Sequence, residues 1–180
     1  WDVGAIKRYT TTAGKLVLSS VTDVSSAQWK GGKTPYITEK VWLRIHPATD
    51  SARVIDFDIE LHARVAGLKI GGSANDKGYG GFSTRIRLPK GLMFRGHKGK
   101  VAPIRTAVPA GPWIDVSGPY NRDGGKSGVS ILVHPSSPGF PQGWILRNSG
   151  SMQNPAYPGQ HPVAIPLGRP MKLRYRLVLH

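Results

Sequence analysis

The fold class can be read from the run Ile55-Asp56-Phe57-Asp58-Ile59-Glu60-Leu61-His62-Ala63-Arg64-Val65. Apolar residues occupy six alternate positions in this run, and charged or polar residues, three of them acidic, fill the positions between them. A period of two residues is typical of a half-buried antiparallel strand, which turns one face to the core and the other to solvent. The run therefore predicts a strand.

The segment just before this run alternates in the same way. Residues 41–46 place apolar side chains on one face and Trp42, Arg44 and His46 on the other, and the turn-prone residues 47–51 follow. A hairpin would bring Arg44 and His46 close to the acids of the second strand, and opposite charges across strands contribute about 0.2–1 kcal/mol per pair. The simplest interpretation of the acidic row is thus a solvated, ion-paired sheet face.

Strand-like patterns recur along the rest of the chain. Further strands are predicted at residues 15–20, 82–88, 128–134, 144–147 and 173–180. Many of the 23 Gly and 15 Pro lie between these segments, and no segment shows a sustained helical period of apolar residues. We expect an all-β fold, an antiparallel sandwich in which residues 1–180 form a single domain.

The charge balance points to an anionic partner. The chain has 25 Lys and Arg against 10 Asp and Glu, a formal net charge of +15, and residues 77–114 and 124–180 contain no acidic residue. Such a balance favours nucleic acid, an acidic or sulfated glycan, or a membrane surface as ligand, the alternative being ordinary surface solvation. The cations are embedded in strand-like sequence, which indicates a folded basic face and not a disordered tail.

Composition also excludes several classes of protein. The chain has no Cys, so disulfides, zinc–thiolate sites and thiol nucleophiles are excluded, and no apolar run is long enough to span a membrane as a helix. The six His show no metal-binding spacing, and no cofactor motif occurs. We therefore predict no metal and no cofactor.

The glycine-rich residues 71–81 contain neither a dinucleotide-binding nor a P-loop motif, and they lead into a predicted strand. They are better interpreted as a flexible loop. If this loop lines a pocket, Arg85 is the cation best placed to meet a ligand.

Trp113 and Asp115 lie two residues apart, so on a strand they share one face. An aromatic ring that stacks beside a carboxylate that binds hydroxyls is a common arrangement in sugar recognition. The alternative is a core Trp beside a turn-capping Asp.

The densest set of polar and aromatic residues surrounds His134. A predicted strand ends at His134, a proline-rich loop follows, and the next strand carries Trp144 and Arg147; Asn154 lies in the polar segment after it. A His exchanges protons near neutral pH, and an Arg binds carboxylate or sulfate in a bidentate manner. We consider His134 a candidate acid/base and the others candidate ligand-binding residues, although a lone His is often purely structural.

Several segments, in chain order, resemble a bacterial protein family. They are residues 55–58, 79–85, 113–118, 127–136, 144–147 and 173–180. The family is the PmoA-like family, which carries a methane-oxygenase label and consists mostly of uncharacterised proteins. The resemblance spans most of the chain, although residues 151–159 depart from the wording that is common in the family.

The resemblance implies a supersandwich similar to galactose-mutarotase-like proteins, with a sheet face that handles carbohydrate. It also implies a His-rich segment upstream of Trp1, so we expect the chain to be part of a longer protein. A periplasmic or extracellular location is the favoured expectation. The residues themselves give the methane-oxygenase label no support, since they include no apolar span and no copper-ligand cluster.

The leading hypothesis is a domain that binds or processes a saccharide, and the charge balance favours an acidic or sulfated glycan. If enzymatic, the full-length protein would act on a glycan as a lyase, a hydrolase or an epimerase-like enzyme. Arg85 and Arg147 would anchor the ligand, Trp113 or Trp144 would stack on a sugar, and Asp115 and Asn154 would bind hydroxyls. The alternatives are a polyanion or nucleic-acid binding module, and a structural sandwich domain of an exported protein.

Overall fold

A computed structural model describes residues 2–11, 13–73, 75–120, 125–150 and 152–180. The strands are β1 Asp2–Thr10, β2 Leu16–Val24, β3 Ile37–Ile45, β4 Arg53–Ala63, β5 Lys69–Ile70, β6 Met93–Gly96, β7 Gly99–Lys100, β8 Trp113–Pro119, β9 Lys126–Val133, β10 Gly143–Ile145, β11 Asn154–Ala156, β12 Val163–Ala164 and β13 Met171–Leu179. In these residues the helical structure is limited to one short 3-10 turn, η1 Lys30–Gly32. The all-β prediction is therefore confirmed.

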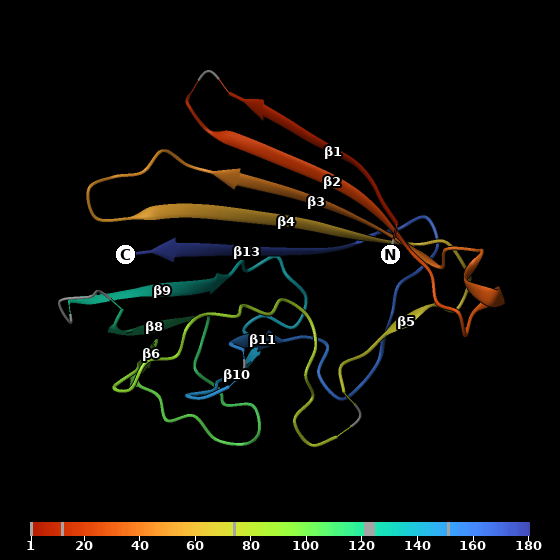
Figure 1. The fold of residues 1–180 in the computed structure, drawn as a ribbon. Helices are drawn as coiled ribbons and strands as arrows, with labels where there is room; N and C mark the ends of the chain where they lie inside the picture. The colour runs from red at the N-terminus through yellow and green to blue at the C-terminus, as the bar shows by residue number, and fades with distance from the viewer. Residues whose placement is uncertain (1, 12, 74, 121–124, 151) are drawn as a thin grey trace.

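Nine of these strands form one antiparallel sheet in the order β1-β2-β3-β4-β13-β9-β8-β6-β7. Figure 1 shows it as a fan from β1 at the top to β6 below, with β13 in the middle. The C-terminal strand β13 is inserted between β4 and β9, so the two halves of the chain meet along it. The remaining strands form the two-stranded sheets β10-β11 and β5-β12.

The predicted hairpin is present as β3 and β4. Their register pairs Arg44 with Asp56 and Trp42 with Asp58, and β13 then pairs Arg176 with Asp56 and Arg174 with Asp58. The polar rows of three neighbouring strands thus lie on one face of the sheet.

One predicted strand is absent. Residues 82–88 form only an isolated bridge between Thr84 and Gln153. Phe82 and Ile86 pack against the core. This packing needs apolar side chains at alternating positions, which is the same sequence pattern that predicts a strand. Conversely, β1 and β6 are strands that the pattern of the sequence did not indicate.

The apolar face of the sheet carries the core. It includes Phe94, Ile114, Val116, Ile131 and Tyr175, all less than 5% exposed. Phe82 from the loop layer packs on this face, edge-on to Phe57 and stacked with Tyr175 at a centroid distance of 4.5 Å. Burial of such rings dominates the energy of a core.

The second layer consists of loops and the small sheets. In Figure 1 these segments lie beside the β13 to β6 part of the sheet and away from β1, β2 and β3. The buried core cluster accordingly draws its sheet residues from β6, β8, β9 and β13, with partly buried residues of β4 packed against it. The opposite face of the sheet carries the polar rows of β3, β4 and β13.

Candidate functional site on the polar face

The polar face is the side of the sheet that faces away from the core. We define it by the outward side chains of four adjacent strands: Arg44 on β3, Asp56, Asp58 and Glu60 on β4, Lys172, Arg174 and Arg176 on β13, and Leu132 on β9. The alternation first seen in residues 55–65 places them there, because their neighbours in sequence point into the core.

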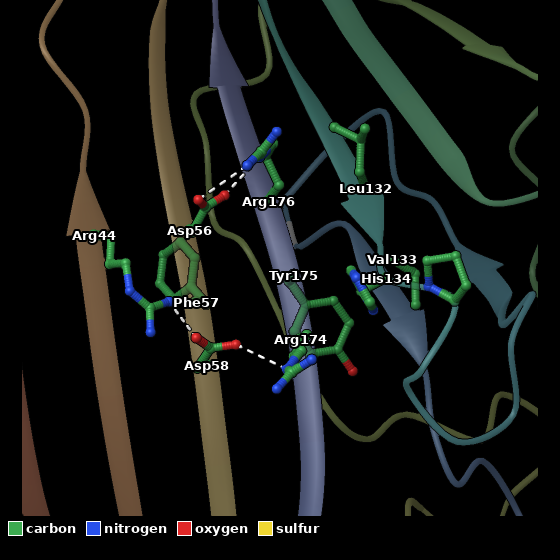
Figure 2. A pocket seen from close by; sticks show the side chains of 11 residues that line it. Arg44, Asp56, Phe57, Asp58, Leu132, Val133, His134, Arg174, Tyr175 and Arg176 are labelled. Carbon is green, nitrogen blue, oxygen red and sulfur yellow. Dashed lines mark hydrogen bonds and ion pairs between the residues drawn. The ribbon is translucent and has the colours of Figure 1, made fainter.

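Each carboxylate of β4 is held between cations from both sides. Figure 2 shows Asp58 between Arg44 and Arg174, with which it forms ion pairs. Arg176 donates two hydrogen bonds to Asp56, from Nε at 2.5 Å and from Nη2 at 3.0 Å. The predicted ion-paired face is thus confirmed, and it includes β13 as well as the hairpin.

The next carboxylate along β4 follows the same pattern. Glu60 pairs with Lys172 at 2.8 Å and with His62 at 3.0 Å. The hydrogen bond from Lys172, aided by that from His62, lowers the pKa of Glu60 although partial burial acts against it. The carboxylate is therefore held in its ionised form.

His46 adds a further partner to Asp56, at 2.8 Å. Partial burial of Asp56 would raise its pKa, but the hydrogen bonds from Arg176 and His46 outweigh burial and lower it. The hydrogen bond to Asp56 in turn raises the pKa of Arg176. Both partners of the Asp56–Arg176 pair thus stay charged.

The cations lie further out than the acids. The side chains of Arg44, Arg174 and Arg176 are 41–49% exposed, whereas those of Asp56 and Asp58 are 20–25% exposed. Arg44 contacts Asp58 through one terminal nitrogen and Arg174 through Nε. Their other N–H groups have no acceptor within the described part of the chain, so they are available to a ligand.

These residues line a cavity of about 500 Å³ on the polar face, within the range of roughly 300–1,000 Å³ that is common for ligand sites. It contains three guanidinium groups and two carboxylates, with His134 at one side. A second hollow of about 320 Å³ shares Arg44, Asp58 and Arg174 and extends to Glu60 and Lys172. Together they form a groove across β3, β4 and β13.

His134 is the predicted site residue that lines this groove. Its backbone N–H donates to the carbonyl of Arg174 at 3.0 Å, which extends the pairing of β9 with β13 by one residue. Nδ1 accepts the backbone N–H of Ser136 at 3.1 Å and lies 2.8 Å from the Ser136 hydroxyl. Since Nδ1 is an acceptor, the neutral ring carries its proton on Nε2.

Trp113 and Asp115 also lie on the polar face. Their neighbours Ile114 and Val116 are fully buried in the core, so the two side chains point the other way. Trp113 is opposite Leu132, which lines the groove and is itself opposite Arg176. The predicted shared face of Trp113 and Asp115 is confirmed, and Trp113 flanks the groove.

Trp144 does not lie on the polar face. It is fully buried among the core residues, and its Nε1 donates to the carbonyl of Gly111 at 2.8 Å. No face of its ring is open to a ligand, so the prediction that Trp144 stacks on a sugar is wrong. Its position on β10, which packs on the apolar face, explains the difference.

Arg147 is likewise structural. Its five N–H donors are used by the Tyr79 hydroxyl, which accepts from Nε and Nη2, and by the carbonyls of Ile104, Leu146 and Arg105. A guanidinium has five donors in all. None remains for a carboxylate or sulfate, which corrects the prediction that Arg147 anchors a ligand.

Asn154 is fully buried. Its Nδ2 donates to the carbonyls of Gly80 and Phe82, each at 2.8 Å, and its Oδ1 accepts the N–H of Gly80. It fixes the segment after the glycine-rich loop and is not open to a ligand, so its predicted role in binding is wrong.

Arg85 is exposed but lies in the loop layer, between Thr84, which pairs with Gln153, and the core residue Ile86. This layer covers the apolar face. Arg85 is not among the residues that line the groove beside His134.

Arg174 and Arg176 were not predicted to be ligand-binding residues. They alternate with the apolar residues of the last strand, which is a usable signal, but local pattern does not show that β13 lies between β4 and β9. That long-range pairing assembles the groove.

No group of three or more His, Asp or Glu among the described residues is arranged to hold a metal ion. No helix in the same part of the chain is long and apolar enough to cross a membrane.

Comparison with known proteins assigns the chain to a family. No curated protein and no solved structure matches it. One family model, described as a family of unknown function, matches residues 4–180, which is nearly the whole chain. The protein thus belongs to the family of unknown function DUF6807.

Proposed function

We propose that the polar face binds a saccharide that carries carboxylate or sulfate groups. The observation that supports this most is the two-level arrangement of charge, with guanidinium groups above carboxylates in a groove of about 500 Å³. Such a surface offers donors for an anionic group and acceptors for hydroxyl groups within a few ångströms. An acidic sugar carries both kinds of group.

Each residue has a distinct part in this proposal. Arg44 and Arg174 present their unused N–H groups to the anionic group of the sugar. Asp56 and Asp58 accept from its hydroxyls, and His134 donates from Nε2. Trp113, on the flank of the groove, supplies an apolar ring on which a sugar face packs.

The resemblance of the sequence to the PmoA-like family and to galactose-mutarotase-like proteins is in line with this proposal. It extends the proposal from binding of the saccharide to its chemical transformation.

A polyanion or nucleic-acid module is the second candidate, because the chain carries a net charge of +15. The groove argues against it, since three cations there face two carboxylates within the same cavity. A phosphate backbone would meet those carboxylates, whereas a groove that tracks phosphates presents cations and stacking aromatic rings. A purely structural domain is the third candidate, and it predicts no ligand on this face.

The test is titration calorimetry with four probes: a uronic-acid oligosaccharide, a sulfated oligosaccharide, a neutral oligosaccharide and a single-stranded oligonucleotide. We expect binding of one or both acidic sugars and weaker binding of the neutral one. Arg174→Ala should abolish or strongly weaken binding, because it removes free donors from the groove. Arg85→Ala is the matched control, an exposed Arg in the loop layer, and should leave binding unchanged.

Binding of the oligonucleotide alone, with an affinity that falls steeply with salt, would favour the polyanion module. Binding of no probe would contradict the proposed function.

A further inference from the structure

A second group of polar residues lies on the same face but outside the groove. His180 Nε2 is 2.7 Å from Oδ1 of Asp115, and the Ser130 hydroxyl donates to the same oxygen at 2.9 Å. The Asp115 side chain is 15% exposed and that of His180 is 38% exposed. The carboxylate is therefore sheltered, while the imidazole is partly open to solvent.

The backbone places His180 for this contact. Although β13 ends at Leu179, His180 still pairs with Gly128, with its N–H donating at 3.1 Å and its carbonyl accepting at 2.7 Å. A Cβ on Gly128 would lie 3.0 Å from Cε1 of the His180 ring and 2.7 Å from the carbonyl oxygen of Val116. The bare glycine thus lets the ring lie across β9 and reach Asp115 on β8.

The hydrogen-bond partners of His180 and His134 determine which ring nitrogen carries the proton in each residue. The Asp115 carboxylate is an acceptor, so Nε2 of His180 carries a proton and Nδ1 holds the lone pair. A ring whose N–H points to a carboxylate presents its other nitrogen as a proton acceptor, as in a His–Asp catalytic pair. His134 has the opposite environment, because its Nδ1 faces the N–H of Ser136 and leaves Nε2–H as a donor.

Two further groups lie around the pair. The Tyr120 hydroxyl is buried and has no hydrogen-bond partner among the residues that the structure describes. Burial and, secondly, the negative charge of Asp115 raise the pKa of Tyr120, which places the phenol within the field of that carboxylate. On the other side, Arg95 of β6 is opposite Asp115 in the register and is exposed. A donor and a cation thus flank the pair.

We propose that His180, oriented by Asp115, is a proton-transfer group at a second point of the polar face. His180 pairs with Gly128, six residues before His134 on β9, so the two points are about 20 Å apart along the strand. The O–H bond of a ligand hydroxyl would break as an N–H bond forms at Nδ1, which gives an alkoxide-like oxygen and an imidazolium, and the reverse transfer would restore the hydroxyl. This role rests on the proposed glycan function, whereas the orientation of His180 does not.

The test uses diethyl pyrocarbonate, which acylates the unprotonated nitrogen of imidazole, with modified residues located by mass spectrometry. We expect His180 to react severalfold faster than His134, because Nδ1 of His180 holds the lone pair whereas that of His134 is occupied by Ser136. Asp115→Asn should slow the reaction of His180 severalfold and leave that of His134 unchanged. The unchanged rate at His134 would also show that the variant is folded.

Equal rates at the two residues, or a rate at His180 that is insensitive to Asp115→Asn, would overturn the proposal. A second arm adds the oligosaccharide that binds best in the calorimetry. Protection of His180 by this sugar supports the proton-transfer role, and binding without protection overturns that role while leaving the proposed function intact. Fast, Asp115-dependent modification with no sugar binding supports the oriented pair and contradicts the proposed function.

Discussion

The two faces of the large sheet use the same residue types for opposite purposes. On the covered side, Trp144 is buried with its N–H satisfied, and all five donors of Arg147 are bound to Tyr79 and backbone carbonyls. On the polar side, Trp113 is partly exposed and Arg174 keeps donors without an acceptor in the described residues. An aromatic or charged residue is therefore a candidate for ligand binding only where its polar groups have no partner within the protein.

The carboxylates on the two faces of the sheet also differ, in the direction of their pKa shifts. Asp56 and Glu60 on the polar face are each paired with two basic groups, and their pKa values are lowered. Glu39 faces the other way, opposite Leu61 in the register, and burial raises its pKa. Ionised Asp56 and Glu60 therefore stabilise the folded state, whereas ionised Glu39 destabilises it.

The largest expected effect tests the covered face. Trp144→Ala should lower the free energy of unfolding by about 3–5 kcal/mol, because it removes a fully buried ring and leaves a cavity. Trp113→Ala is the matched control and should cost clearly less. Urea denaturation followed by circular dichroism measures both, and a larger loss at Trp113 would contradict the assignment of the two faces.

Arg147→Ala should have the second-largest effect and lower the free energy of unfolding by about 1–3 kcal/mol. The substitution leaves the backbone carbonyls that the guanidinium now binds without a donor. Arg85→Ala, an exposed position in the same layer, should change stability by no more than about 0.5 kcal/mol. The same denaturation experiment compares them. Similarly small losses of stability at both positions would mean that the hydrogen bonds of Arg147 do not stabilise the fold.

The acids of the polar face predict a dependence on pH. Because the pKa of folded Asp56 lies below its ordinary value of 3.8, the ionised carboxylate stabilises the fold above that value. The contribution is lost as the pH falls through the lower folded pKa. Asp56→Asn should therefore be less stable than the wild type at pH 6, and the difference should shrink steadily below about pH 4 in urea titrations at each pH.

Glu39 predicts the opposite sign and the smallest effect. Its folded pKa lies above the ordinary value of 4.5, so ionisation at neutral pH costs stability. Glu39→Gln should raise the urea midpoint at pH 7, and this gain should vanish as the pH falls below the ordinary value. A loss of stability at pH 7 would show that Glu39 has a favourable partner.

Much of the sheet could be predicted from local pattern, and little of the site. The alternation in residues 55–65 correctly indicated β4, its hairpin with β3 and the pairing of Arg44 and His46 with acids. The same reasoning misplaced Trp144, Arg147 and Asn154, because nothing local shows whether a polar or aromatic residue is saturated by distant groups. The insertion of β13 beside β4, which brings in Arg174 and Arg176, is a long-range pairing of the same kind.

Binding of an acidic sugar to the polar face can be followed through the indole N–H signals of the Trp side chains, recorded by NMR during titration with a uronic-acid oligosaccharide. Trp113 flanks the groove and Trp144 is buried under the opposite face. We expect a saturable shift of the Trp113 signal and no shift of the Trp144 signal, with the response lost in Arg174→Ala. A shift of the Trp144 signal while that of Trp113 stays in place would contradict this expectation.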